Sequence, residues 1–180
     1  MSKYTQEFNV SFENVIGVEG RYSNHKADTG GATMFGITEK VARKWGYKGS
    51  MRKLPLETAK EIYYANYWKP QNLDKIAKIS MSIADECFEA SVNMGLSRPA
   101  KYLQRSINGF KRRGNMLAVD GKLGAKTLLA LKQASKDKRN LTGIFKLQNC
   151  LQGVFYLGLA ERKSSQKVFL LGWVNKRVVL

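Results

Sequence analysis

The chain has 180 residues, of which 43% are hydrophobic and 11% aromatic, and it carries a formal net charge of +17 at pH 7. This composition is typical of a folded globular protein and excludes a disordered one, and no apolar run approaches the roughly 18 residues that a membrane-spanning helix needs. One histidine and two cysteines provide no Cys/His cluster for a structural zinc ion, so we expect neither a metal site nor a cofactor.

The first predicted helix begins near the N-terminus. Phe8, Phe12, Val15 and Ile16 recur there at helical spacing, and Gly20 marks the end of the helix. The polar, glycine-rich stretch "RYSNHKADTGGATMFGI" that follows predicts a short hairpin. This hairpin is the one small β element that we expect.

Three further helices are predicted in the first half of the chain. Thr38 is the expected N-cap of "EKVARKW", which Gly46 ends, and Pro55 opens "LETAKEIYYANYW", which Pro70 closes. The third helix, "SMSIADECFEASVNMG", ends at Gly95. Its expected inward-facing residues are Ile83, Cys87, Phe88, Ser91 and Met94.

The second half is also predicted to be helical. Ser97 is the expected N-cap of a helix that buries Leu103 and Ile107, and "NGFKRRGNMLAVDGKLG" is expected to be a loop with its tightest turn at Asp120-Gly121. The stretches "AKTLLALKQAS", "NLTGIFKLQNCLQGVFYLGLAERK" and "SQKVFLLGWVNKRV" predict the remaining helices. The expected fold class is therefore mostly α, a helical bundle with a small β-hairpin.

Both cysteines lie in apolar helical patterns. The N-terminus, "MSKYTQEFNVSFENV", lacks the basic and apolar regions of a secretion signal, which predicts synthesis in the cytoplasm. Because two cysteines without such a signal rarely form a disulfide, we expect Cys87 and Cys150 to be buried free thiols.

The positive charge is concentrated in the second half of the chain. Residues 1–95 hold 13 Lys and Arg against 11 Asp and Glu, whereas residues 96–180 hold 18 against three. We therefore expect two parts, 1–95 and 96–180, packed as one globule. A field like that of the second part recruits polyanions such as nucleic acid, anionic lipid, cell-wall polymers or lipopolysaccharide.

An acidic residue interrupts the apolar face of the first predicted helix. Phe12, Val15 and Glu19 are three and then four residues apart, so they share one face. A carboxylate in an apolar cleft loses solvation, which raises its pKa and lets it act as a general acid near neutral pH. The alternative is a half-exposed glutamate at a frayed helix end.

The hairpin offers partners for this acid. Asp28 follows Glu19 by nine residues and Thr33 follows Asp28 by five, so a hairpin folding back over the helix end brings both beside it. An acid, a second carboxylate and a hydroxyl around one cleft suit glycoside hydrolysis, in which one group protonates the leaving oxygen and others orient or activate water. Alternatively, Asp28 and Thr33 only brace the hairpin.

The stretch "EGRYSNHKADTGGATMFGIT" closely resembles the signature of glycoside hydrolase family 108, the N-acetylmuramidases of phage endolysins. "LPLETAKEIYYANYW" and "ADECFEASVNMG" are similar to the next helices of that family. "AKYLQRSI", "VDGKLGAKTLLAL" and "KVFLLGWVNKRV" resemble its C-terminal part, a predicted peptidoglycan-binding region. The resemblance covers essentially the whole chain and implies a lysozyme-like α+β fold for residues 1–95.

The resemblance also implies roles for individual residues. Glu19 matches the catalytic proton donor of the family, and Asp28 and Thr33 match the Asp and Thr of its motif. Arg21 stands where glycine is usual, so it is expected to contact substrate or to lower the pKa of the acid. Two further departures from the common loop are Lys26-Ala27 and Thr29, which replaces a proline.

Several other residues could line a sugar cleft, because aromatic faces pack on pyranose rings and amides read acetamido groups. The candidates for substrate binding are Tyr22, Tyr67, Trp68 and Asn93, with core packing as the alternative for the aromatic residues and helix capping for Asn93. His25 is expected to be a solvated loop residue and Trp173 a core residue.

The function implied by the resemblance is hydrolysis of the β-1,4 bond between N-acetylmuramic acid and N-acetylglucosamine by a monomeric endolysin. Its expected partner is peptidoglycan, reached in the periplasm after holin-type release. Lipopolysaccharide is a second possible partner, through the basic half. The alternatives are a non-catalytic wall-binding protein and a nucleic-acid-binding protein, the second disfavoured because no nucleic-acid-binding motif occurs. The segment "ERKSSQKVFLLGWVNKRVVL" is either a core helix or an amphipathic helix that disturbs the outer membrane.

Overall fold

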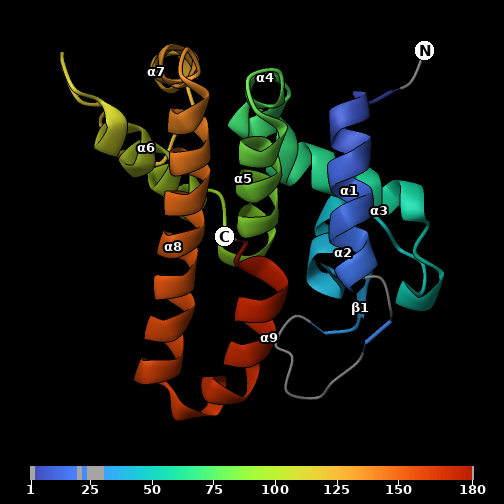
Figure 1. Cartoon of the computed structure of the whole chain (residues 1–180). Helices are drawn as coiled ribbons and strands as arrows, with labels where there is room; N and C mark the ends of the chain where they lie inside the picture. The colour runs from blue at the N-terminus through green and yellow to red at the C-terminus, as the bar shows by residue number, and fades with distance from the viewer. Residues whose placement is uncertain (1–2, 20–21, 24–30, 180) are drawn as a thin grey trace. The chain divides into compact units, whose positions relative to one another are not determined.

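The backbone of the computed structural model is mostly helical, and its described residues include one small antiparallel sheet, which confirms the predicted fold class (Figure 1). The structure describes residues 3–19, 22–23 and 31–179. It divides into two compact units, Met1–Pro70 and Gln71–Leu180. In this described part, no helix combines the length and the apolar character that crossing a membrane requires.

The first unit is built around α1 (Gln6–Glu19), which forms where the apolar spacing predicts it. Phe8, Phe12 and Val15 are buried on one face of this helix. Edge-on ring contacts hold that face in the core, with centroids 5.7 Å apart for Phe12 and Tyr63 and 5.3 Å apart for Phe8 and Trp68.

The other helices of the first unit begin and end near the predicted residues. Thr38 caps α2 (Glu39–Trp45) by accepting a hydrogen bond from the Val41 amide, and Gly46 ends the helix in the left-handed region, at φ 101°. Pro55 precedes α3 (Leu56–Tyr63). The remaining elements are β1 (Thr33–Met34), β2 (Ile37–Thr38), η1 (Met51–Lys53), the π-helical turn η2 (Tyr64–Trp68) and η3 (Lys69–Gln71).

Pro70 does not end the helical path as predicted. The chain continues from α3 through η2 into the short 3-10 turn η3, which contains Pro70, because the first turn of a helix tolerates a residue without an N–H. The path breaks at Asn72, whose φ is +54°. A further helix that the sequence reading omitted, α4 (Leu73–Ala77), follows and buries Leu73 and Ile76.

The second unit is a helical bundle around one long helix. Its members after α4 are α5 (Met81–Met94), α6 (Ser97–Phe110), α7 (Ala125–Ala134), α8 (Lys138–Arg162), η4 (Ser164–Gln166) and α9 (Lys167–Arg177). The long helix α8 packs against α5, α6, α7 and α9, and Figure 1 shows α9, in red, folding back beside it. Because α5 packs on α4, α6 and α8, it belongs to this unit although it precedes residue 96.

Several expectations for the second unit need correction. Ser97 is the first residue of α6 and Leu96 occupies the cap, while the helix runs on through residues 108–110, which were expected to be loop. Cys87 is buried as predicted, but Cys150 is exposed, because the apolar pattern around it does not turn its own face toward the core.

The C-terminal segment is not a core helix. No residue of α9 is buried, and Val168 and Leu171 are 76% and 72% exposed. Trp173 is half-buried, with its ring stacked on those of Tyr156 and Phe169 at centroid distances of 5.2 and 5.8 Å. Helix α9 therefore lies on the surface of its unit, and the stacking of Trp173 on Tyr156 attaches it to α8.

Candidate active site

The candidate acid lies at the end of a helix with a well-packed start. Glu19 is the last residue of α1, four residues after the buried Val15. The side chain of Glu19 and the predicted site residues Arg21 and Asp28 lie outside the described residues, as does His25. The described geometry therefore concerns the segments on either side of them.

A tight hairpin follows in the chain. Thr33 pairs with Thr38 and Met34 with Ile37, and the two turn residues, Phe35 and Gly36, both have positive φ, 53° and 71°. Two positive φ values in a two-residue turn are typical of the type I′ hairpin. The predicted hairpin therefore exists, and its turn is "FG".

Hydrogen bonds anchor the first strand close to the end of α1. The Ser23 amide donates to the Thr33 carbonyl oxygen at 2.9 Å, and the Thr33 amide donates to the Ser23 carbonyl oxygen at 2.7 Å. Ser23 is only four residues after Glu19, a stretch that spans at most ~14 Å. Backbone pairing thus keeps Thr33 within reach of the helix end that carries the candidate acid.

A second contact fixes the turn to the core of the unit. The buried Tyr63 hydroxyl on α3 donates to the Phe35 carbonyl oxygen at 3.0 Å. The Thr33 hydroxyl donates to the Gly31 carbonyl oxygen at 3.4 Å, a long bond that also suits the bracing role. The hairpin is therefore held at both ends.

The positive φ of Gly36 in this turn predicts an effect of substitution on stability. Gly36→Ala places a side chain at positive φ, so we expect the free energy of unfolding to fall by about 1–2 kcal/mol. Gly17→Ala is the matched control, because a Cβ at this exposed position in α1 meets nothing within 4 Å and alanine is the better helix former by about 0.5–1 kcal/mol. Thermal unfolding should therefore show shifts of opposite sign. Equal shifts would mean that the turn is not strained.

Tyr22, a predicted substrate residue, has one described neighbour of note. The Arg52 guanidinium carbon lies 3.9 Å from the centroid of its half-buried ring. Such cation–π stacking orients the ring and covers part of it. Arg52 lies on η1, thirty residues away in a polar stretch, and no local pattern in the sequence indicated it.

The structure places Trp68 in the core, away from solvent. It is fully buried and packs edge-on against Phe8, so its indole presents no surface to a sugar ring. The burial of Trp68 therefore supports core packing, the alternative to substrate binding at this position. Tyr67 is half-buried, with its ring 5.8 Å from that of Tyr63, and burial raises the pKa of its hydroxyl.

Asn93 lies in the second unit, near the end of α5. Its exposed side-chain amide donates to the Glu89 carbonyl oxygen at 2.8 Å and to the Glu89 carboxylate at 2.7 Å. The amide is therefore engaged with its own helix. Its role in reading acetamido groups stays a prediction.

Next to Asn93, a polar cluster is buried between helices of the second unit. Burial and, as a smaller contribution, the nearby negative charge of Glu89 raise the pKa of the Glu86 carboxyl to about 8, although a hydrogen bond with Asn149 lowers it. The Glu89 carboxylate accepts hydrogen bonds from Arg177 at 2.8 Å and from Gln152 at 2.9 Å. The cluster therefore connects α5 with α8 and α9 around a carboxyl group that is protonated at neutral pH.

The absence of a cluster of metal-ligating side chains is established only for the described part of the chain. There, no three His, Cys, Asp or Glu side chains lie close enough together to hold an ion.

Comparison with known proteins finds a matching family model for each half of the chain. The family model for "Glycosyl hydrolase 108" matches residues 12–95, and the one for "Predicted Peptidoglycan domain" matches residues 98–178. A comparison with curated proteins found no match. The solved structure entitled "Structure of Brucella abortus SagA" is similar, with a TM-score of 0.61 and 26% sequence identity, over 93% of this chain and 95% of that one. These findings support a glycoside hydrolase that acts on peptidoglycan. The chain is therefore similar to the glycosyl hydrolase 108 family over residues 12–95 and to a predicted peptidoglycan domain over residues 98–178.

Proposed function

We propose that the protein is an N-acetylmuramidase, which hydrolyses the β-1,4 bond between N-acetylmuramic acid and N-acetylglucosamine. The observation that carries the proposal is the position of Glu19 at the end of α1, four residues before the backbone pairing of Ser23 with Thr33. The family match over residues 12–95 supports glycosidic chemistry at this place.

In the proposed mechanism Glu19 is the general acid. It protonates the glycosidic oxygen as the bond to the leaving sugar breaks, and water completes the hydrolysis at the muramic acid carbon. Asp28 and Thr33 position or activate that water, and Arg21 contacts the substrate beside the acid. Tyr22 offers the part of its ring that Arg52 leaves open to a sugar face.

The products of digestion test the reaction class. Purified peptidoglycan is digested with the protein, reduced with borohydride and analysed by mass spectrometry. A muramidase leaves a reduced muramic acid at each new end. Reduced glucosamine ends would assign the protein as a glucosaminidase, and freed peptides without new reducing ends would make it an amidase or a peptidase. An absence of soluble products would favour the non-catalytic wall-binding alternative.

We further propose that the protein is a phage endolysin, acting on the wall in the periplasm and causing lysis of the host. The strongly basic composition of the chain supports this role, because an enzyme that cuts an insoluble anionic polymer must stay near it between cuts. Residues 96–180 carry 18 Lys and Arg against three acidic residues and supply this attraction, to which lipopolysaccharide also responds. We propose that a monomer suffices.

A further inference from the structure

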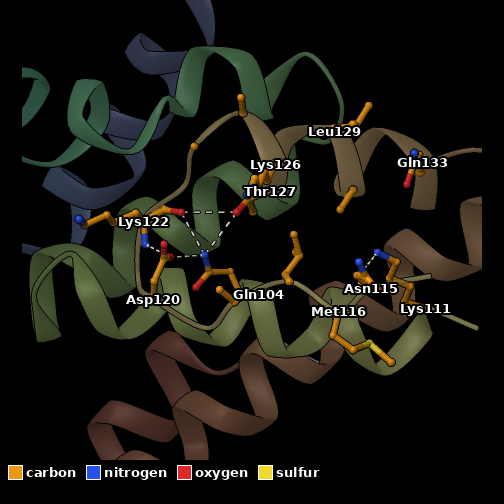
Figure 2. Close-up of a pocket in the computed structure, with 15 residues that line it drawn as sticks. Gln104, Lys111, Asn115, Met116, Asp120, Lys122, Lys126, Thr127, Leu129 and Gln133 are labelled. Carbon is orange, nitrogen blue, oxygen red and sulfur yellow. Dashed lines mark hydrogen bonds between the residues drawn. The ribbon is translucent and has the colours of Figure 1, made fainter. Parts of the chain in front are cut away.

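The predicted peptidoglycan domain contains a pocket of about 720 Å³. It lies between α6, the loop of residues 111–124 and α7, as Figure 2 shows. Pockets that bind small molecules commonly have volumes of about 300–1,000 Å³. Neither family model nor any feature of the candidate active site assigns an occupant to this pocket.

A buried glutamine holds the floor of the pocket in shape. The Gln104 side chain is 2% exposed, and its amide nitrogen donates to the Asp120 carboxylate at 2.7 Å and to the Lys122 carbonyl oxygen at 3.0 Å (Figure 2). Its amide oxygen accepts from the Gly121 amide at 2.9 Å. Because these bonds fix the loop against α6, the pocket is formed before any ligand arrives, which lowers the cost of binding.

The walls of the pocket are aliphatic. Met116 and Leu129 are 60% and 59% exposed, and Leu117, Ala118 and Ala130 extend the apolar lining. Among the fifteen lining residues, all of them described, there is no aromatic side chain. Proteins bind sugar rings largely by packing aromatic faces on them, so this lining suits alkyl groups better than a glycan.

The charges around the walls are mostly positive. The lining residues include Lys111, Lys122 and Lys126 against a single acid, Asp120. The Asp120 carboxylate accepts hydrogen bonds from Gln104 and from the Lys122 backbone amide, which lower its pKa. These bonds engage the carboxylate in holding the loop. The net charge of the pocket therefore favours ligands with carboxylates.

We infer that this pocket binds the stem peptide of peptidoglycan, through its free carboxylates and aliphatic side chains. That peptide combines alanine methyl groups with the carboxylates of isoglutamate, diaminopimelate and its own C-terminus, which matches aliphatic walls with lysines around them. The inference rests on the proposed function only in taking peptidoglycan as the substrate. It adds that the second half recognises peptide while the first half cuts glycan.

Binding is measured by calorimetry with the full chain carrying Glu19→Gln, so that no substrate is cut. The probe is the tetrapeptide alanyl-isoglutamyl-diaminopimelyl-alanine. On this background, Lys126→Glu reverses a charge in the pocket and should weaken binding by about tenfold or more. Lys132→Glu makes the same change on the exposed surface of α7, outside the pocket, and should change binding by less than about twofold. Both positions are exposed, and unfolding curves verify that both variants fold.

Two further ligands test whether the pocket recognises the carboxylates of the peptide or the glycan. The tetrapeptide with all its carboxylates amidated should bind about tenfold or more weakly, and an N-acetylglucosamine oligomer without peptide should not respond to Lys126→Glu. Equal losses for the Lys126 and Lys132 variants, or an affinity for the glycan that depends on Lys126, would overturn the inference. Failure of the muramidase assay with intact peptide binding would refute the proposed reaction and leave this inference standing.

Discussion

The Glu19→Gln protein should fold normally and hydrolyse peptidoglycan at least ~100-fold more slowly than the unaltered chain. Glutamine keeps the shape of the side chain but has no proton to give to a leaving oxygen, and general acid catalysis contributes about 10²–10⁴-fold. Folding should survive because Glu19 is the last residue of α1, beyond the buried Phe8, Phe12 and Val15. The rate is measured as loss of turbidity of Gram-negative cells with permeabilised outer membranes, and as new reducing ends on purified wall.

Glu13→Gln is the matched control for this experiment. Glu13 is an exposed glutamate on the same helix, so its replacement makes the same change of charge and leaves the candidate acid in place. We expect it to retain lytic activity within about twofold. A folded Glu19→Gln protein that lyses as fast as Glu13→Gln would refute the mechanism proposed for Glu19.

The second large effect is expected on stability, from Glu86 on α5. In the folded chain this carboxyl has a pKa of about 8, compared with 4.5 when solvated. Between these two values the folded state holds a proton that the unfolded state has released, so the free energy of unfolding should fall as the pH rises from about 4.5 to about 8. Above pH 8 both states are ionised, and this dependence ends.

Glu86→Gln removes that dependence, because the amide keeps the hydrogen bonding and never ionises. We expect the variant to be more stable at pH 8 by an amount on the order of a few kcal/mol, which corresponds to a rise of several degrees in Tm. The other charged groups around the site are Glu89 on the same helix and Arg177 on α9, which pair with each other, together with the Tyr156 hydroxyl on α8.

Glu161→Gln, at an exposed glutamate on α8, is the control and should leave the pH dependence unchanged. Thermal unfolding of the three proteins at pH 5, 6.5 and 8 compares them directly. A wild-type Tm that stays constant or rises across this range, with Glu86→Gln following it, would show that Glu86 is not held protonated.

Local signals in the sequence predicted those parts of the fold that local contacts determine. Thr38 and Gly46 cap α2 because a cap needs only a hydroxyl or a left-handed φ at one position. The burial of Trp68 depends on Phe8, sixty residues earlier, and the ring of Tyr22 is covered by Arg52 from another turn. Such contacts are decided by tertiary packing, and no spacing within one segment reveals them.

The same reasoning applies to the candidate site. The motif indicated Glu19, Asp28 and Thr33 because their residue types and order suit glycoside hydrolysis. It could not indicate that Ser23 pairs with Thr33 or that Tyr63 holds the hairpin turn, because these bonds join segments that meet only in the fold. The pocket around Gln104 was missed for the same reason, since its bonds reach residues 16 to 23 positions away.

The unequal exposure of the two cysteines has a practical consequence. Cys87 is buried and the pKa of its thiol is raised by burial, whereas Cys150 is exposed on α8. Since the chain holds two cysteines in all, a maleimide dye or spin label added to the folded protein attaches at one defined place. The unmodified sequence therefore accepts a single reporter group in the predicted peptidoglycan domain. The same thiol would join two chains on oxidation, so preparations without a reductant should contain a covalent dimer.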